Sequence, residues 1–335
     1  MAYLRNVTMS ETRVQTAYLV NPGDANPLEI LHGGIMMNWI VSTGTLAVSR
    51  LSRGNAVLGS LDSVFFVNPV KVGDLVRVDS WVEYVGTSSA EVAVRAQSEN
   101  PVTHKLTTTT FSHLAFVAVD FRGEPRPINV KLTPTASEME SYRLARQRWQ
   151  NRRRVLADRR AKSLDVRPYA TTGEWRLNSS RIVFSDDALY GELMFAGRLL
   201  KLLDELTGNL ATKFCGGSVV TGSVDEMSFY HPIRVGDILD VSVALNYVGK
   251  SSLELGAKVV TEDPFSGKRR HAATAYYTFV HLDKSGHPAS VPEYRPSGAE
   301  ALLRFKEAQQ RMGRRKRKLT LFKKYISTLS VPAFI

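Results

Sequence analysis

The sequence predicts an α+β protein made of two copies of one domain, each with a long central helix and an antiparallel sheet. Residues 69–92 recur as residues 232–255 at an offset of 163 residues, without any insertion. About sixteen of the thirty-five positions in 57–91 are identical to their counterparts at the same offset. Such self-similarity indicates a duplicated domain. In each copy one long apolar segment precedes a series of alternating segments, an order that predicts a sheet wrapped around one helix.

Each copy opens with a turn-rich loop, which reads "DANPLEILHGG" at 24–34 and "DALYGELMFAG" at 187–197. The segments that follow, 34–51 and 197–214, are long and apolar enough to form helices that are buried on most of their circumference. The remaining segments alternate apolar and polar residues, are rich in Val, Thr and Phe, and are separated by Gly and Pro turns, which is typical of strands. The strands predicted in this way are 75–86, 89–100 and 106–120 in the first copy, and 238–249, 252–263 and 269–283 in the second.

A basic helix is predicted after each domain, because "ARQRWQNRRR" at 145–154 lies opposite "AQQRMGRRKR" at 308–317 at the same offset. The predicted organisation is therefore a first domain at 1–130, a charged helical linker at 131–166, a second domain at 167–298 and a basic helix and tail at 299–335. The net charge is +12, with much of the excess in these helices. Such clusters could contact nucleic acid, an anionic membrane surface or a phosphate-bearing ligand, or form a solvated helix face. Because they recur with the domains, we interpret them as architectural and expect no nucleic-acid partner.

Several classes of protein are disfavoured by composition. No run approaches the ~18 apolar residues of a membrane-spanning helix, and the start "MAYLRNVTMSETRV" lacks the apolar core of a secretory signal. We therefore expect a cytoplasmic protein without stable membrane insertion, although the tail "LFKKYISTLSVPAFI" could touch a membrane surface. The single cysteine, Cys215, excludes internal disulfides and Cys-rich zinc sites. The histidines at 113, 231, 271 and 281 lack metal-ligand spacing, so we expect no metal.

A predicted buried helix preceded by "DANPLEILHGG", and repeated with "GSVDEMSFYHPIRVGD", "YVGKSS" and "LDKSGHP" after it, resembles the hotdog fold. More narrowly, the chain resembles the acyl-CoA thioesterases that carry two hotdog domains in one chain, over roughly 20–128 and 183–292 and the charged helix after each. The resemblance implies hydrolysis of acyl-CoA to free fatty acid and coenzyme A. It implies no separate cofactor, since coenzyme A is part of the substrate and product, and it implies a homo-oligomer, a trimer of two-domain chains.

Thioester hydrolysis needs a carboxylate and donors for the negative charge that grows on oxygen. The resemblance implies that Asn26, from the first "DAN" loop, and Asp204, from the second helix, supply them together. Their counterparts at the 163-residue offset are Leu189 and Val41, so the losses are complementary. The sequence therefore predicts one composite working site and one vestigial site. Whether Asp204 acts as nucleophile or general base stays open.

Both assignments have structural alternatives. Asn26 precedes Pro27 in a segment with ordinary turn chemistry. Asp204 could pair with Lys201 one turn back, although Glu205 fits that ion pair better. The face of the helix that carries Asp204 is largely apolar, so we expect burial to raise the pKa of this carboxyl.

The helix start "HGG" provides His32, Gly33 and Gly34 as candidates for oxyanion or substrate binding, because unpaired backbone amides point outward there. "YVGKSS" provides Lys250, Ser251 and Ser252 as candidate contacts of coenzyme A, although this is also ordinary turn composition.

Two other functions remain as alternatives to the thioesterase. One is a non-catalytic acyl-CoA-binding regulator, which would not require Asp204. The other is a hotdog hydratase or dehydratase, which pairs a histidine with an acid. It is disfavoured because the helix positions that would supply an acid to His32 hold Val41 and Ser42.

Overall fold

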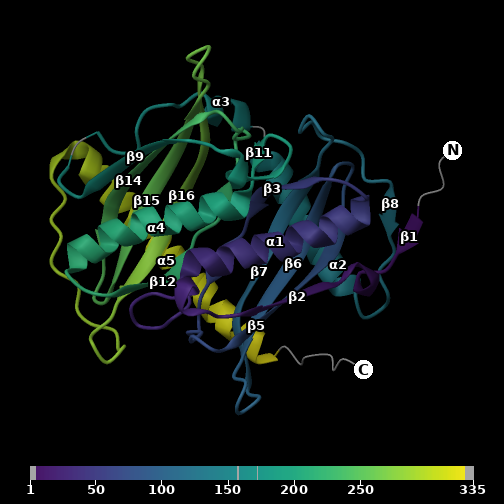
Figure 1. Cartoon of the computed structure of the whole chain (residues 1–335), viewed down its shortest axis with the longest axis horizontal. Coiled ribbons are helices and arrows are strands. Elements are labelled where there is room, and N and C mark those ends of the chain that lie inside the picture. Colours follow the sequence, from purple (N-terminus) through teal and green to yellow (C-terminus); the bar gives the residue numbers. More distant parts are fainter. Residues whose placement is uncertain (1–4, 157, 172, 329–335) are drawn as a thin grey trace.

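The computed structural model describes residues 5–156, 158–171 and 173–328. Two six-stranded antiparallel sheets each cradle one long helix, α1 (Gly33–Ser52) in the first domain and α4 (Ala196–Cys215) in the second. The two helices lie side by side across the sheets (Figure 1). The α+β prediction of a repeated helix and antiparallel sheet is therefore confirmed.

The first sheet has the order β13-β3-β7-β6-β5-β2, and the second has the order β4-β12-β16-β15-β14-β9. The strands of the first domain are β2 (Val14–Leu19), β3 (Ala56–Leu61), β4 (Val64–Phe65), β5 (Leu75–Val85), β6 (Ser89–Glu99) and β7 (Leu106–Ala118). Those of the second are β9 (Arg176–Ile182), β12 (Val219–Val224), β13 (Met227–Ser228), β14 (Ile238–Val248), β15 (Ser252–Glu262) and β16 (Arg269–His281). The long strands fall where alternation of apolar and polar residues predicts them.

The domains exchange a short strand with each other. β4 of the first domain pairs with β12, so that Val64 lies opposite Val224. β13 of the second domain pairs with β3, so that Met227 lies opposite Leu61. Each sheet is therefore completed at one edge by the other domain.

Smaller elements flank the sheets. β1 (Arg5–Val7) pairs in parallel with β8 (Val130–Leu132), and β10 (Ala188–Tyr190) pairs with β11 (Leu193–Met194). Short helical segments complete the chain: the 3-10 turns Ser10–Thr12, Pro22–Asp24 and Ser185–Asp187, and α3 (Arg159–Ser163).

The basic helix α2 (Met139–Leu156) packs on β5 and β6 of the first sheet. Arg152 donates to Asp62 at 2.7 Å and to Glu91 at 3.0 Å. Glu91 is buried, and burial raises the pKa of its carboxyl to about 7, although Arg152 opposes the shift. The helix is thus clamped to the sheet by paired charges.

The basic helix α5 (Gly298–Thr328) repeats this clamp in the second domain. Arg315, the counterpart of Arg152, donates to Asp225 and to Glu254 at 2.7 Å each. Toward its end α5 reaches the first domain, where Phe322 contacts Phe65. These contacts support the architectural interpretation of the basic helices. The part of the predicted tail after residue 328 lies outside the described residues.

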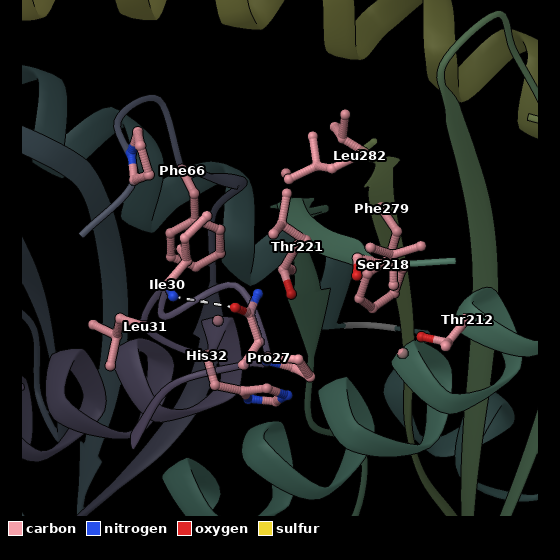
Figure 2. Close-up of a pocket in the computed structure, with 18 of the residues that line it drawn as sticks. Pro27, Ile30, Leu31, His32, Phe66, Thr212, Ser218, Thr221, Phe279 and Leu282 are labelled. Atoms are coloured by element: carbon pink, nitrogen blue, oxygen red, sulfur yellow. Dashed lines mark hydrogen bonds between the residues drawn. The ribbon is translucent and has the colours of Figure 1, made fainter. Parts of the chain in front are cut away.

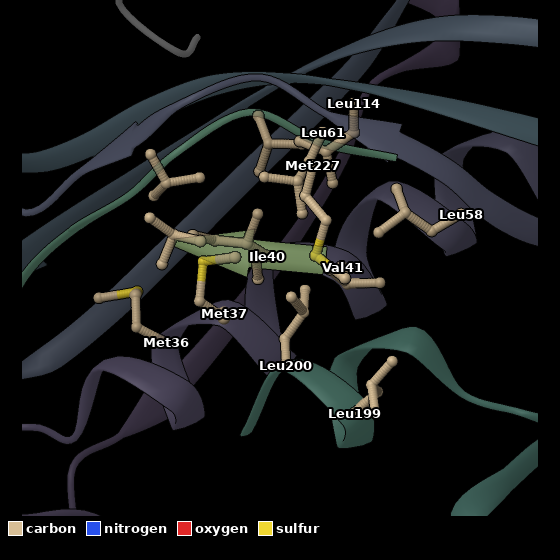
Figure 3. Packing of buried hydrophobic residues seen from close by; sticks show 14 of the residues in the cluster. Met36, Met37, Ile40, Val41, Leu58, Leu61, Leu114, Leu199, Leu200 and Met227 are labelled. Carbon is tan, nitrogen blue, oxygen red and sulfur yellow. The ribbon is translucent and has the colours of Figure 1, made fainter. Parts of the chain in front are cut away.

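The core between the helices and sheets is apolar. Val41 of α1 is fully buried and lies among Leu61, Leu200 and Met227 (Figure 3). No helix in the described part of the chain is long and apolar enough to cross a membrane.

Candidate active site

Asp204 of α4 lies at the contact between the two central helices. Its side chain is 0% exposed. The backbone amide of Gly34, at the start of α1, donates to Asp204 Oδ2 at 2.7 Å. The Thr221 hydroxyl, from β12, donates to Asp204 Oδ1 at 2.9 Å. The carboxylate is therefore held by donors from both domains.

Glycine at the start of α1 permits this close approach. A Cβ on Gly34 would lie 2.8 Å from the Lys201 Cα and 3.0 Å from the Asp204 Cβ. A Cβ on Gly33 would lie 2.6 Å from the Thr221 Cβ. The absence of a side chain at both positions lets the start of α1 approach the second domain closely enough for the Gly34 amide to reach the carboxylate.

The environment raises the pKa of Asp204. Burial disfavours the charged form and is the largest cause, while His32 and the hydrogen bonds from Thr221 and Gly34 act in the opposite direction. A carboxylate with a raised pKa is a stronger base than an exposed aspartate. The expectation of a raised pKa agrees with this environment. Lys201 lies 3.7 Å from Glu205, as the spacing predicted, and leaves Asp204 free of that ion pair.

His32 is the N-cap residue of α1, and its Nδ1 accepts from the Gly34 amide at 3.2 Å. The same Nδ1 lies 3.2 Å from Asp204 Oδ2. On its own helix His32 has no acidic partner, as Val41 and Ser42 indicated, but a carboxylate lies beside its ring all the same. The acid comes from the other domain, which the comparison of positions on its own helix could not reveal.

Asn26 closes a tight loop before α1. Its Oδ1 accepts from the amides of Leu28, at 2.9 Å, and Ile30, at 3.1 Å; the bond from Ile30 is drawn in Figure 2. Its Nδ2 has no hydrogen-bond partner among the described residues. The turn interpretation is therefore confirmed, and the site interpretation stays a prediction that is compatible with it, because the turn uses the oxygen and leaves the NH₂ as a donor.

A cavity of about 980 Å³ opens at this point between the two domains. Asn26, His32 and Gly33 line it from the first domain, and Thr221 and Phe279 line it from the second. Figure 2 shows His32 and Pro27 on one side and Thr221 and Ser218 on the other. Asp204 lies beneath the wall, where its carboxylate contacts His32 and Thr221.

Sequence reasoning missed Thr221. Its counterpart at the 163-residue offset is Leu58. Asn26 and Asp204, which the resemblance implied, show the same polar-to-apolar asymmetry, and a comparison of every position of the repeat would have found Thr221.

The three candidate coenzyme A contacts do not line this cavity. Lys250 and Ser251 lie in the turn between β14 and β15, and Ser252 is the first residue of β15. The Ser251 carbonyl accepts from the His281 amide. A Cβ on Gly217, which lines the cavity, would lie 2.7 Å from the His281 ring. The turn is therefore connected to the outer rim of the cavity through His281.

The pseudo-twofold counterpart of this cavity is also present, with a volume of about 480 Å³. Leu189, Phe195 and Leu58 line it at the positions of Asn26, His32 and Thr221. Val41, at the position of Asp204, is buried beneath apolar side chains. This second cavity contains none of the groups that surround Asp204.

Among the described residues no group of three or more His, Cys, Asp and Glu side chains is placed to hold a metal ion. Cys215 ends α4 half-buried, and burial raises the pKa of its thiol to about 11. This thiol is therefore protonated at neutral pH.

Comparison with known proteins assigns the fold. The thioesterase superfamily matches residues 28–104 and 191–266, one segment in each domain. The cytosolic acyl coenzyme A thioester hydrolase of Homo sapiens is 26% identical over 311 residues, which cover 88% of this chain and 81% of the human one. The acyl-CoA thioester hydrolase YkhA of Bacillus subtilis, itself uncharacterized, is 34% identical over 134 residues, which cover 40% of this chain and 78% of YkhA.

An acyl-CoA hydrolase from Staphylococcus aureus, solved with butyryl coenzyme A, coenzyme A and coenzyme A disulfide, is 30% identical and has a TM-score of 0.42. The match covers 47% of this chain and 96% of that one.

The fold and the paired sites define a protein of the thioesterase superfamily with one hotdog domain in each half. The thioesterase superfamily matches both halves of the chain, and the relatives that span most of the chain are acyl-CoA thioester hydrolases. The chain belongs to the family of acyl-CoA thioesterases with two hotdog domains.

Proposed function

We propose that this protein hydrolyses acyl-CoA to a free fatty acid and coenzyme A at one composite site between its two domains. The observation that carries the proposal is the buried carboxylate of Asp204, held by the Gly34 amide of the other domain. A non-catalytic regulator has no need of a desolvated carboxylate beside a cavity.

In the proposed reaction Asp204 is the base or the nucleophile. As base it takes a proton from a water that attacks the thioester carbonyl carbon; as nucleophile it attacks that carbon itself, and water then hydrolyses the acyl-enzyme. In both routes the C–S bond breaks, and the thiolate of coenzyme A leaves and is protonated. The raised pKa makes the ionised carboxylate of Asp204 a stronger base than that of an exposed aspartate.

The negative charge on the carbonyl oxygen is met by donors from the first domain. The Asn26 Nδ2 donates into the cavity, because its Oδ1 is held by the loop. Gly33 at the start of α1 supplies a backbone amide, and the positive end of the helix favours the developing anion. Gly34 was a second candidate for this role, but its amide binds Asp204 and serves to hold the base.

The candidate coenzyme A contacts lie outside the cavity, in a turn that neighbours its rim through His281. In this proposal Lys250, which is exposed, attracts a phosphate of coenzyme A, while Ser251 and Ser252 border the path of the pantetheine arm. We also propose that the enzyme acts in the cytoplasm, which the name of its mammalian relatives supports, and that it forms the predicted trimer of two-domain chains.

The test is turnover of acyl-CoA measured as free thiol release. We expect Asp204→Asn and Asn26→Ala each to lose about 10² or more in kcat, the scale for removal of a transition-state group. The matched controls are Val41→Ala and Leu189→Ala at the counterpart positions, which we expect to keep the wild-type kcat. Wild-type turnover in Asp204→Asn would overturn the mechanism.

The contact between His32 and Asp204 makes the hydratase alternative worth a direct measurement. Incubation with an enoyl-CoA distinguishes the two reactions, since hydration adds water to the double bond without releasing thiol. We expect thiol release alone.

A further inference from the structure

The second cavity repeats the lining of the active-site cavity at the 163-residue offset. Four matched pairs of lining residues show this: Phe66 and Phe229, Pro69 and Pro232, Val220 and Val57, and Pro288 and Pro125. The backbone frame of a substrate cleft is therefore present twice in the chain.

The second cavity has apolar residues at the positions of Asn26, His32 and Thr221, but it has not closed. Its volume is about 480 Å³, against about 980 Å³ for the active-site cavity. That volume remains inside the range of roughly 300–1,000 Å³ typical of small-molecule sites. Leu189 at its mouth is 46% exposed, although it is a large apolar residue. An apolar cleft with an exposed apolar mouth is suited to a hydrocarbon chain.

The rim retains a positive charge that is weakly paired. Arg234 lines the cavity, and its guanidinium lies 3.8 Å from Glu192, whose side chain is 79% exposed. His231 also lines it; burial and then Arg270 lower the pKa of this histidine, so its ring is a neutral hydrogen-bond donor at pH 7. The one acid of the lining, Glu124, is exposed to solvent. A carboxylate therefore finds a cation and a donor at the rim.

We propose that this second cavity is a non-catalytic binding site for a long-chain fatty acid, with the hydrocarbon chain among Leu58, Leu189 and Phe195 and the carboxylate at Arg234. The choice of ligand rests on the proposed function, because a fatty acid is the product of that reaction. The site would let the enzyme hold its product without carrying out chemistry on it.

Photo-crosslinking of the full-length protein locates the ligand. A palmitic acid analogue with a diazirine in its tail should label peptides that contain 189–195 or 229–234, in addition to the active-site cleft. Leu189→Asp should reduce this labelling at least about tenfold, because it places a charge beside the chain and repels the carboxylate. The matched control is Leu164→Asp, which changes another exposed leucine, one that lines neither cavity, and this variant should be labelled as the wild type is.

Recognition of the carboxylate is tested separately by calorimetry with dodecanoate and dodecanol. Arg234→Gln should weaken dodecanoate binding at the second site about tenfold and leave dodecanol binding unchanged. Equal loss for both ligands, or none for dodecanoate, would contradict the role of Arg234.

Competition identifies the source of the acyl chain. Unlabelled palmitate should protect the 189–195 and 229–234 peptides. If they are labelled in no condition, or if only a non-hydrolysable S-hexadecyl coenzyme A protects them, the fatty-acid site is wrong. Thiol release by Leu189→Asp and by wild type is measured in parallel and should be equal. If the wild type released no thiol from acyl-CoA, that result would instead count against the proposed function.

Discussion

The backbone amide of Gly34 in one domain donates a hydrogen bond of 2.7 Å to the Asp204 carboxylate of the other. The bond crosses the interface between the two central helices, where Asp204 has no exposure to solvent. The proposed base is thus positioned by the association of the domains and not by its own domain alone. The predictions below follow from this dependence.

Asp204→Asn should separate stability from activity. A buried Asp with a raised pKa destabilises the fold as pH rises, because the folded state binds its proton more tightly than the unfolded state. The neutral amide lacks this cost, so we expect Asp204→Asn to be at least as stable as wild type at pH 7 while losing turnover. Thermal unfolding between pH 5 and pH 8 measures the effect. The gain in Tm over wild type should shrink as pH falls; a gain that grew toward low pH would contradict the raised pKa.

Thr221→Ala should move the acid limb of the pH profile of kcat/KM to higher pH. The Thr221 hydroxyl donates to the ionised carboxylate and so lowers the pKa of Asp204. Its loss raises that pKa further, and more of the enzyme is protonated at a given pH. We also expect kcat to fall by roughly tenfold, since hydrogen bonds to charged groups contribute about 1.5–3 kcal/mol.

Thr221→Ser, which keeps the hydroxyl, is the control for that profile and should restore the wild-type acid limb. An unshifted limb in Thr221→Ala would mean that Thr221 has only a packing role.

Gly34→Ala should abolish activity and weaken the contact between α1 and α4. Its Cβ would meet the Lys201 Cα at 2.8 Å, and backbone cannot move aside without shifting the helix. Gly197→Ala is the matched control at the counterpart position, where the nearest atoms are the Asn38 Oδ1 at 2.5 Å and the Phe195 ring at 2.6 Å.

The atoms nearest a Cβ on Gly197 belong to side chains that can rotate away, so Gly197→Ala should turn over substrate at the wild-type rate. The measurement is thiol release together with the midpoint of urea unfolding. Normal turnover in Gly34→Ala would show that the close approach of the helices is not needed.

Arg152→Met should destabilise the protein by about 3 kcal/mol, since it removes the nearest cation from the buried Glu91 carboxylate. Arg152 is 13% exposed and pairs with Asp62 and Glu91. Arg154→Met, two residues on and exposed, is the control, with an expected change near zero. Urea unfolding measures both. If the two variants unfolded alike, the basic helix would be a solvated face and not a clamp.

Much of the fold could be predicted from the sequence because the repeat shows each element twice. Alternation of apolar and polar residues located the long strands, and the apolar segments located α1 and α4. The exchanged strands β4 and β13 could not be predicted, because each has two residues and takes its partner from the other domain. Two residues are too short for a periodic pattern.

Part of the candidate site could also be predicted from the sequence. The family resemblance pointed to Asn26 and Asp204, and comparison of the copies showed that their counterparts are lost together; the structure brings Asn26 to the cavity beside which Asp204 is buried. The contact of His32 with Asp204, and the use of the Gly34 amide as its donor, depend on how closely two helices pack. That distance is set by glycines meeting a backbone across an interface, which no local pattern records.

The exchange of β4 and β13 has a consequence for how the chain holds together. Thr221 belongs to β12, and β4 of the first domain pairs with this strand at the edge of the second sheet. The part of the cavity wall that Thr221 forms therefore lies on a strand that is hydrogen-bonded to both domains. The two domains are therefore held together mainly by the exchanged strands and their packing, and less by the covalent connection through α2. A chain cut by a protease within 131–138, before α2 begins, should remain one particle on gel filtration and should still turn over substrate, whereas either half made alone would lack the edge strand that its partner supplies.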